Sequence, residues 1–165
     1  MTSLTENDLV FDFSAAQNAI KFDDNELHLS STIKRVDFIA EYTDKIVFLE
    51  VKDPDIPGAA NVGAFISKLQ SGKLITELAA KYRDSHWFRL HSGHAGKPIH
   101  YVVLLAMASL DPALLLVKQD QLKSAIPITH QNWSEPCAQS CIILNFAKYQ
   151  EYFGAYAVRR RSAGN

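Results

Sequence analysis

The sequence predicts an α/β protein in which a central mixed β-sheet has helices on both sides. The chain of 165 residues is 47% hydrophobic with only 7 Gly and 6 Pro, so it can bury a continuous core. Its periodic segments follow one another in the order helix, hairpin, helix, strand, helix, strand. No internal repeat or Ser/Gly-rich linker separates them, which predicts a single domain over residues 1–165.

The charge balance limits the partners that this chain can bind. It carries 17 Lys and Arg against 18 Asp and Glu, a formal net charge of -1. Nucleic acid would therefore be held by a local basic patch and not by overall charge. Two cysteines, Cys137 and Cys141, are too few for a disulfide framework, and no apolar run is long enough to span a membrane. With no basic, apolar leader at the N-terminus, these features predict a cytoplasmic protein without a membrane partner.

The first part of the chain is expected to form a helix and then a hairpin. Ser14 can cap a short helix that reaches Ile20. Over residues 32–52, β-branched and aromatic residues gather in two runs separated by Thr43 and Asp44. This is the pattern of two antiparallel strands joined by a tight turn.

The remaining elements are predicted from residues that interrupt a strand or helix and from apolar residues that recur at helical intervals. Two prolines in Asp53–Gly58 remove backbone donors, so the second strand ends there. Apolar residues then recur at helical intervals over Asn61–Arg83, which predicts one amphipathic helix softened at Gly72. The same signals predict a loop over 91–98, a buried strand over 99–107, a helix over 111–124 opened by Asp-Pro, a strand over 141–146 and a helical turn over 148–152.

The hairpin has a register that can be predicted. A turn centred between Thr43 and Asp44 places Ile39 opposite Phe48 and Asp37 opposite Glu50. Alternation then gives one wholly apolar face, made of Val36, Phe38, Ala40, Val47, Leu49 and Val51. The other face carries Asp37, Ile39, Ile46, Phe48, Glu50 and Lys52.

Two carboxylates that face each other require a compensating charge. Directly opposed like charges in an antiparallel pair cost roughly 0.2–1 kcal/mol, and more when they are desolvated. A divalent cation between Asp37 and Glu50 would offset this cost, because hard ions prefer carboxylate and carbonyl oxygens. Lys52 lies on the same face and could orient an attacking water or stabilise a developing oxyanion. Together these groups predict metal-assisted hydrolysis of a phosphodiester.

Val36-Asp37 and the later Glu50-Val51-Lys52, preceded by the apolar run Ile46-Val47-Phe48-Leu49, resemble the PD-(D/E)XK motif of restriction-endonuclease-like nucleases. The resemblance implies an αβββαβ core with a four-stranded mixed sheet between helices. It implies that Asp37 and Glu50 bind Mg²⁺ or Mn²⁺, that Lys52 is the catalytic lysine, and that the carbonyl of Val51 is a further metal ligand.

Three features depart from the family pattern. Val36 replaces the proline, a residue that does no chemistry. An acid from the first helix often completes such a site, and Asp23, Asp24 and Glu26 are equal candidates. Some relatives carry Gln followed four residues later by Tyr on the next helix, whereas Leu74 follows Gln70 at that spacing here.

The function predicted from these residues is that of a metal-dependent nuclease acting on DNA. A small core without strong positive charge would need a homodimer to build a cleft, or a partner to deliver the substrate. A different class of function is a catalytically inactive binding or regulatory protein on the same fold. A third interpretation is structural: Lys52 and Arg35 pair with the acids as ordinary surface ions.

Other conspicuous residues are given structural interpretations. The histidines lack the spacing of a zinc site and are assigned to an incidental loop cluster: His86, His91, His94 and His100. The two cysteines are interpreted as small thiols in the core or in a loop, not as metal ligands. Trp87, Phe88 and Trp133 are interpreted as core residues. Lys68, Lys73 and Lys81 are expected on the solvent face of the long helix, and Arg159, Arg160 and Arg161 in a flexible tail over 159–165.

Overall fold

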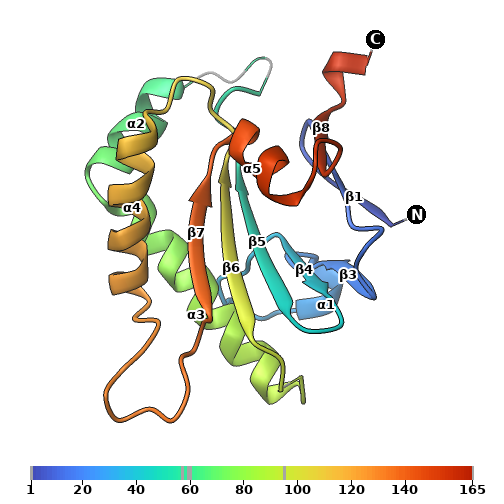
Figure 1. Cartoon of the computed structure of the whole chain (residues 1–165), viewed down its shortest axis with the longest axis vertical. Helices are drawn as coiled ribbons and strands as arrows, with labels where there is room; N and C mark the ends of the chain where they lie inside the picture. Colours follow the sequence, from blue (N-terminus) through green and yellow to red (C-terminus); the bar gives the residue numbers. More distant parts are fainter. Residues whose placement is uncertain (1, 57, 59–60, 95, 165) are drawn as a thin grey trace.

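The computed structural model describes residues 2–56, 58, 61–94 and 96–164 and shows a mixed α/β fold with two sheets (Figure 1). The larger sheet has five strands in the order β3-β4-β5-β6-β7, where β3 to β5 are antiparallel and β5 to β7 are parallel. Its strands are β3 (Asn18–Lys21), β4 (Phe38–Glu41), β5 (Ile46–Lys52), β6 (Ile99–Leu105) and β7 (Ser140–Leu144). A smaller antiparallel sheet combines β1 (Ser3–Glu6), β2 (Leu9–Asp12) and β8 (Val158–Arg160).

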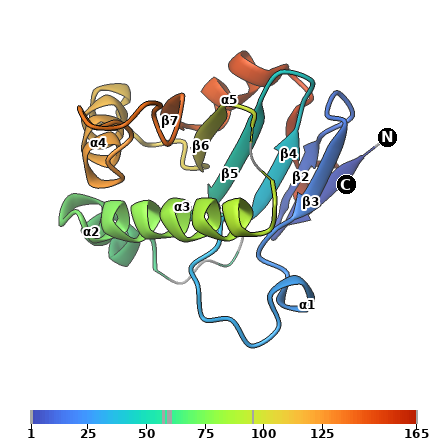
Figure 2. The same cartoon turned by 90° about the horizontal axis from the view of Figure 1, so that it is seen from below.

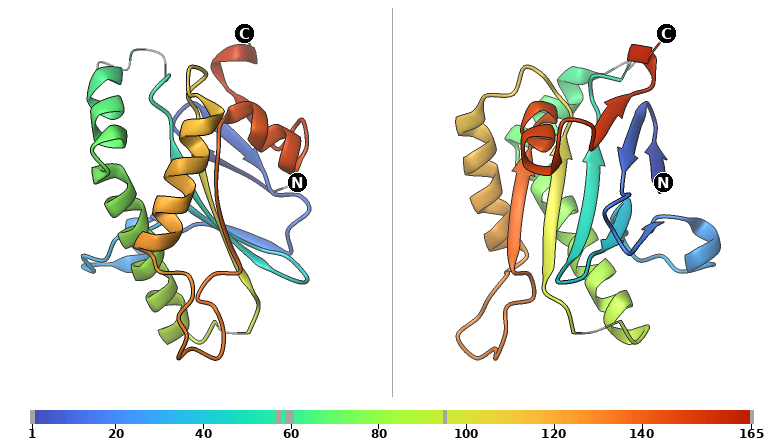
Figure 3. Two further views of the ribbon diagram at one scale, coloured as in Figure 1. Left: turned by 60° about the vertical axis from the view of Figure 1, so that its left-hand side comes forward. Right: turned by 45° about the vertical axis from the view of Figure 1, so that its right-hand side comes forward.

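Helices cover both faces of the larger sheet. They are α1 (Asn25–His28), α2 (Val62–Gln70), α3 (Lys73–His91), α4 (Pro112–Ala125) and α5 (Phe146–Phe153), followed by a 3₁₀ turn over Ser162–Gly164. The pair α3 and α4 lies on one face, with α2 at the start of α3 (Figures 1 and 2). The smaller sheet and α5 lie on the other face (Figure 3).

Each face of the larger sheet has its own apolar core. Phe48 and Ile39 pack under α3, together with Leu78 and Tyr82 of that helix. On the other face, the core joins the larger sheet to β2, β8 and α5 through Phe38, Ala40, Val47, Leu49, Val51, Leu9, Phe11, Tyr149 and Val158. The face of the hairpin that carries Asp37 and Glu50 is therefore covered by α3, and Lys52 at the end of β5 is the residue of this face that is partly exposed.

The predicted hairpin register is confirmed. Ile39 pairs with Phe48, and Ala40 with Val47. The backbone N–H of Tyr42 donates to the carbonyl of Lys45 at 2.8 Å, which closes the turn. The predicted faces are also confirmed except at Val36, which precedes β4 and packs in the core under α3.

The later elements agree closely with the sequence. The helix at 112–125 begins as expected, because the side chain of Asp111 accepts a hydrogen bond from the N–H of Ala113 at 2.8 Å. The expected strands at 99–107 and 141–146 are found as β6 and β7, and the expected turn at 148–152 is part of α5.

Two of the helix predictions were wrong: one segment does not form a helix, and the other forms two helices. Residues 14–20 do not form a helix, because Ser14 bonds to the carboxylate of Asp12 and β3 begins at Asn18 and pairs with β4. The single helix expected over 61–83 is two helices, α2 and α3, and α3 continues to His91. Gly72 separates them with a φ of 80°, which no helix interior accommodates.

The smaller sheet was not predicted, and it changes the description of the chain end. Arg159 and Arg160 belong to β8, which pairs with β2, and not to a flexible tail. Two aromatic residues assigned to the core are largely exposed: Trp87 at 57% and Trp133 at 46%. Phe88 packs against the core under α3 as expected. None of the described helices combines the length and apolar character needed to cross a bilayer.

Candidate functional site

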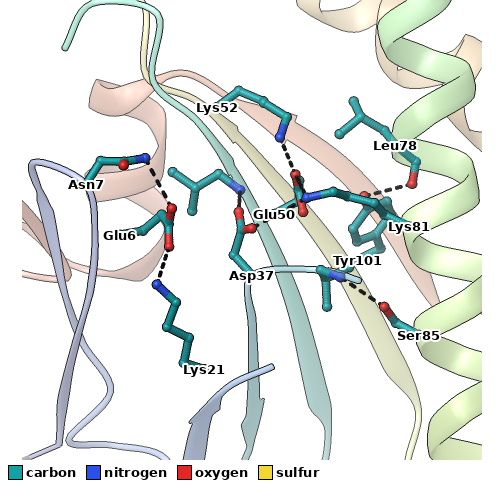
Figure 4. Close-up of polar contacts among 12 residues, drawn as sticks. Glu6, Asn7, Lys21, Asp37, Glu50, Lys52, Leu78, Lys81, Ser85 and Tyr101 are labelled. Carbon is teal, nitrogen blue, oxygen red and sulfur yellow. Dashed lines mark hydrogen bonds and ion pairs between the residues drawn. The ribbon is translucent and has the colours of Figure 1, made fainter. Parts of the chain in front are cut away.

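Asp37, the residue before β4, and Glu50 of β5 lie on either side of the ammonium group of Lys81 (Figure 4). One carboxylate oxygen of Asp37, Oδ2, accepts the backbone N–H of Val51 at 2.6 Å. The other oxygen, Oδ1, lies 3.5 Å from the Nζ atom of Lys81, and the same Nζ lies 2.6 Å from Oε1 of Glu50. A single ammonium group therefore spans the two acids.

Lys52 reaches the same acid from β5. Its Nζ atom lies 2.6 Å from Oε1 of Glu50, so that oxygen contacts two ammonium groups. The side chains of Lys52 and Lys81 are 29% and 24% exposed, and they form the solvent side of the cluster. The expected place of Lys81 on the solvent face of the helix was wrong, whereas the side chain of Lys68 is 36% exposed and pairs with Glu77.

Contacts between α3 and the sheet place Lys81 over the acids. The backbone N–H of Val36 donates to Oγ of Ser85 at 3.0 Å, which ties α3 to the residue before Asp37. The hydroxyl of Tyr101 donates to the carbonyl of Leu78 at 3.0 Å (Figure 4). Because these anchors lie three residues before and four after Lys81, its side chain emerges at the border of the buried stripe of the helix.

Burial sets the protonation of this cluster. Glu50 is 0% exposed and Asp37 is 5% exposed. Burial raises the pKa of both carboxyl groups, and the charge of Asp37 raises the pKa of Glu50 further, while Lys52 and Lys81 oppose the rise. Burial alone would lower the pKa of Lys81, but the two carboxylates outweigh it and raise that pKa. The lysines are the charges that favour ionised acids here.

One oxygen of Glu50 has no partner among the described residues. Its Oε2 atom is buried and makes no hydrogen bond. Buried carboxylate oxygens are nearly always satisfied, so such an atom in a native fold requires an explanation. An ordered water and a hard cation are both partners that suit its chemistry.

A second group of acids meets on the other side of Asp37. Ligand atoms of Glu6, Asp23 and Asp37 all lie within 4.8 Å of one another. Glu6 comes from β1 and forms an ion pair with Lys21 at 2.8 Å. Burial raises the pKa of Asp23, whose Oδ1 atom is also buried without a partner among the described residues.

The three acids that were candidates to complete the site have different surroundings. Asp23 joins Asp37, while Asp24 caps α1 by accepting the N–H of Glu26 at 2.9 Å. Glu26 is exposed. Glu6 was missed, because it belongs to a strand of the unpredicted smaller sheet and no local pattern links it to Asp37.

Val51 presents its backbone to Asp37. Its N–H points toward β4, and the N–H and C=O of one strand residue point to the same side of the strand. The carbonyl of Val51 is therefore directed to the side of β5 on which Asp37 lies. The next carbonyl, that of Lys52, points the other way and accepts the N–H of Ala106 at 2.8 Å.

The histidines and cysteines lie away from the acids. His86, His94 and Cys137 are among the residues that line a cavity of about 610 Å³ near the loop before β6. His100 contacts Oγ of Ser140 at 2.8 Å. A shallow depression of the surface lies along α4 and is lined by Val117, Gln121 and Ala125. Neither the cavity nor the depression is lined by Asp37 or Glu50.

Comparisons with known proteins give no further guide: no protein family, no curated protein and no solved structure matches this chain.

Proposed function

We propose that the protein is a metal-dependent nuclease that hydrolyses phosphodiester bonds in DNA, built on a restriction-endonuclease-like core. The observation that carries the proposal is the meeting of two buried carboxylates, Asp37 and Glu50, with Lys52 beside them. The element order supports it as well, because an antiparallel meander is followed by helix-linked parallel strands.

The donor set suits Mg²⁺ or Mn²⁺. Asp37, Glu50 and the carbonyl of Val51 would hold the ion, and the unpartnered Oε2 of Glu50 is a free ligand atom. Asp23 and Glu6 bring two further carboxylates to the other side of Asp37. An ion held there would supply Lewis-acid activation of the phosphodiester.

In this proposal Lys52 is the lysine that assists the attacking water. Its stem starts at the last residue of β5 and its ammonium group is held by Glu50 at 2.6 Å. From there it can donate hydrogen bonds to a water or to a phosphoryl oxygen on which charge develops. The reaction then proceeds by direct attack of water, without a covalent intermediate on the protein.

The lysines of the site are all paired with acids: Lys21 with Glu6, Lys52 with Glu50, and Lys81 with both Asp37 and Glu50. A divalent ion would neutralise part of this acidic charge and leave the ammonium groups able to contact phosphate groups. A cleft for a duplex would come from a homodimer, or from a partner that delivers the DNA.

A second candidate function is a binding or regulatory module that keeps this core without catalysis. The favouring observation is that both acids are buried and already face lysine ammonium groups. In such a module the lysines would permanently replace a metal ion.

Incubation with plasmid, linear and single-stranded DNA in Mg²⁺ or Mn²⁺ tests the proposal. We expect cleavage by the wild-type protein and a loss of about a hundredfold or more in Lys52→Ala and Asp37→Asn, because each removes a group that acts on the reacting atoms. Glu151→Gln is a matched control, since that side chain is 70% exposed and forms a surface ion pair with Lys148. Cleavage that survives in Lys52→Ala contradicts the mechanism. DNA binding without cleavage favours the second candidate.

A further inference from the structure

We infer that Lys81 is an internal counter-ion that occupies the cation position between Asp37 and Glu50 and leaves it when a divalent metal ion binds. Once displaced, its ammonium group is free to contact a phosphate group of the substrate. This inference rests on the proposed function, because it concerns the same acids, and it assigns a role to a residue outside the motif.

The contacts of Lys81 define this position. Its Nζ atom lies 2.6 Å from Oε1 of Glu50 and 3.5 Å from Oδ1 of Asp37. The other oxygen of Asp37, Oδ2, accepts the N–H of Val51, so Oδ1 is the oxygen of Asp37 that no backbone group engages and that faces the ammonium group of Lys81. The ammonium group and a metal ion that joins both carboxylates therefore compete for the same oxygen.

Lys81, and not Lys52, is the ammonium group that lies between the two acids. Lys52 contacts Glu50 from the same strand, whereas Lys81 reaches across from α3 and links both acids. The helix backbone is anchored by Leu78 and Ser85, so the long stem of Lys81 can turn while the helix stays in place. Its side chain is 24% exposed, which leaves a path toward solvent.

Displacement of Lys81 would couple metal binding to substrate binding. A divalent ion repels an ammonium group a few ångströms away, and a phosphate attracts it. Metal binding would thus free a cation for the substrate, and by linkage the substrate would strengthen metal binding by the same factor.

Calorimetric titration with Mn²⁺ tests the competition directly. We expect Lys81→Met to bind Mn²⁺ about tenfold more tightly than the wild-type protein, because a competing positive charge has been removed. Lys81→Arg keeps the charge and is expected to bind within about threefold of the wild type. Lys68→Met is the matched control from α2, where the lysine is partly exposed and pairs with Glu77 away from the two acids, and we expect it to leave the affinity unchanged.

The direction of the change separates this role from a structural one. If Lys81 only held the acids in place, its loss would weaken Mn²⁺ binding. Lys81→Gln, which keeps a hydrogen-bond donor without the charge, serves if Lys81→Met does not fold. Thermal melting gives a second readout: Mn²⁺ should raise the Tm of the neutral variant more than that of the wild type.

The outcomes distinguish this inference from the proposed function. Equal or weaker Mn²⁺ binding by both neutral variants, with Mn²⁺-dependent cleavage of DNA by the wild type, overturns the role of Lys81 and leaves the nuclease. Absence of Mn²⁺ binding in the wild type and in the neutral variants overturns both.

Discussion

Glu50 is a fully buried carboxylate whose two oxygens have different surroundings. Oε1 contacts the ammonium groups of Lys52 and Lys81, and Oε2 has no partner among the described residues. Burying a charge is costly unless it is paired and hydrogen-bonded, so half of this group is compensated and half is not. The imbalance makes Glu50 the residue at which pH and metal ions should act most strongly.

We expect Glu50 to give the protein an unusual pH dependence. Burial and the nearby Asp37 raise its pKa above the ordinary value of 4.5, so the folded protein holds a proton that the unfolded chain releases. In the window between these two pKa values, the free energy of unfolding falls as the pH rises. Without metal, the wild type should lose stability relative to Glu50→Gln as the pH rises above 4.5.

Urea unfolding at a series of pH values from about 5 to about 8 measures this difference. Glu151→Gln should follow the wild type across the range, because that carboxylate is exposed. If the stability curves of the wild type and Glu50→Gln ran parallel, Glu50 would not be the titrating group.

At the scale of elements, the hairpin and the long helical segment show which boundaries depend on local chemistry. The turn at Tyr42–Lys45 fixes the pairing of β4 with β5, so the register follows from the sequence around it. Gly72 marks the other boundary with its φ of 80°. Apolar residues continue at helical intervals across it, so periodicity alone suggested one helix where the backbone forms two.

Two glycines in this segment should respond in opposite ways to alanine. Gly72→Ala should destabilise the protein by about 1 kcal/mol, because alanine is strained at that φ although no atom lies within 4 Å of an added Cβ. Gly63→Ala lies inside α2, where an added Cβ also meets nothing within 4 Å, and should stabilise by about 0.5–1 kcal/mol. Denaturant unfolding of both variants checks this, and equal effects would exclude strain at Gly72 as the cause of the helix break.

At the scale of the whole molecule, the ends of the chain meet in a sheet that carries an acid to the site. β8 pairs with β2, and β1 brings Glu6 to Asp37. Arg160 joins this sheet to the larger one, because its two Nη atoms each lie 2.9 Å from an oxygen of Asp53, the residue after Lys52. The side chain of Asp53 is 1% exposed and that of Arg160 is 23% exposed, so the acid of this ion pair is buried and the base is partly exposed.

We expect Arg160→Met to destabilise the protein by about 2 kcal/mol, because it leaves the buried Asp53 carboxylate without its cation. Arg159→Met is the control from the same strand, where the exposed side chain should contribute less than about 0.5 kcal/mol. Denaturant unfolding at constant pH measures both. A loss in Arg160→Met no larger than in Arg159→Met would show that the ion pair does not hold the two sheets together.

The sequence by itself determined the features that depend on neighbours along the chain. The turn set the pairing of β4 with β5 up to Phe38 opposite Leu49, next to Asp37 and Glu50, and the Asp111 cap placed the start of α4. The tertiary structure alone decided that Lys81 and Glu6 join the acids. The rotation of a helix over a sheet, and the docking of a second sheet, result from the packing of many side chains distant in sequence, and no local period records them.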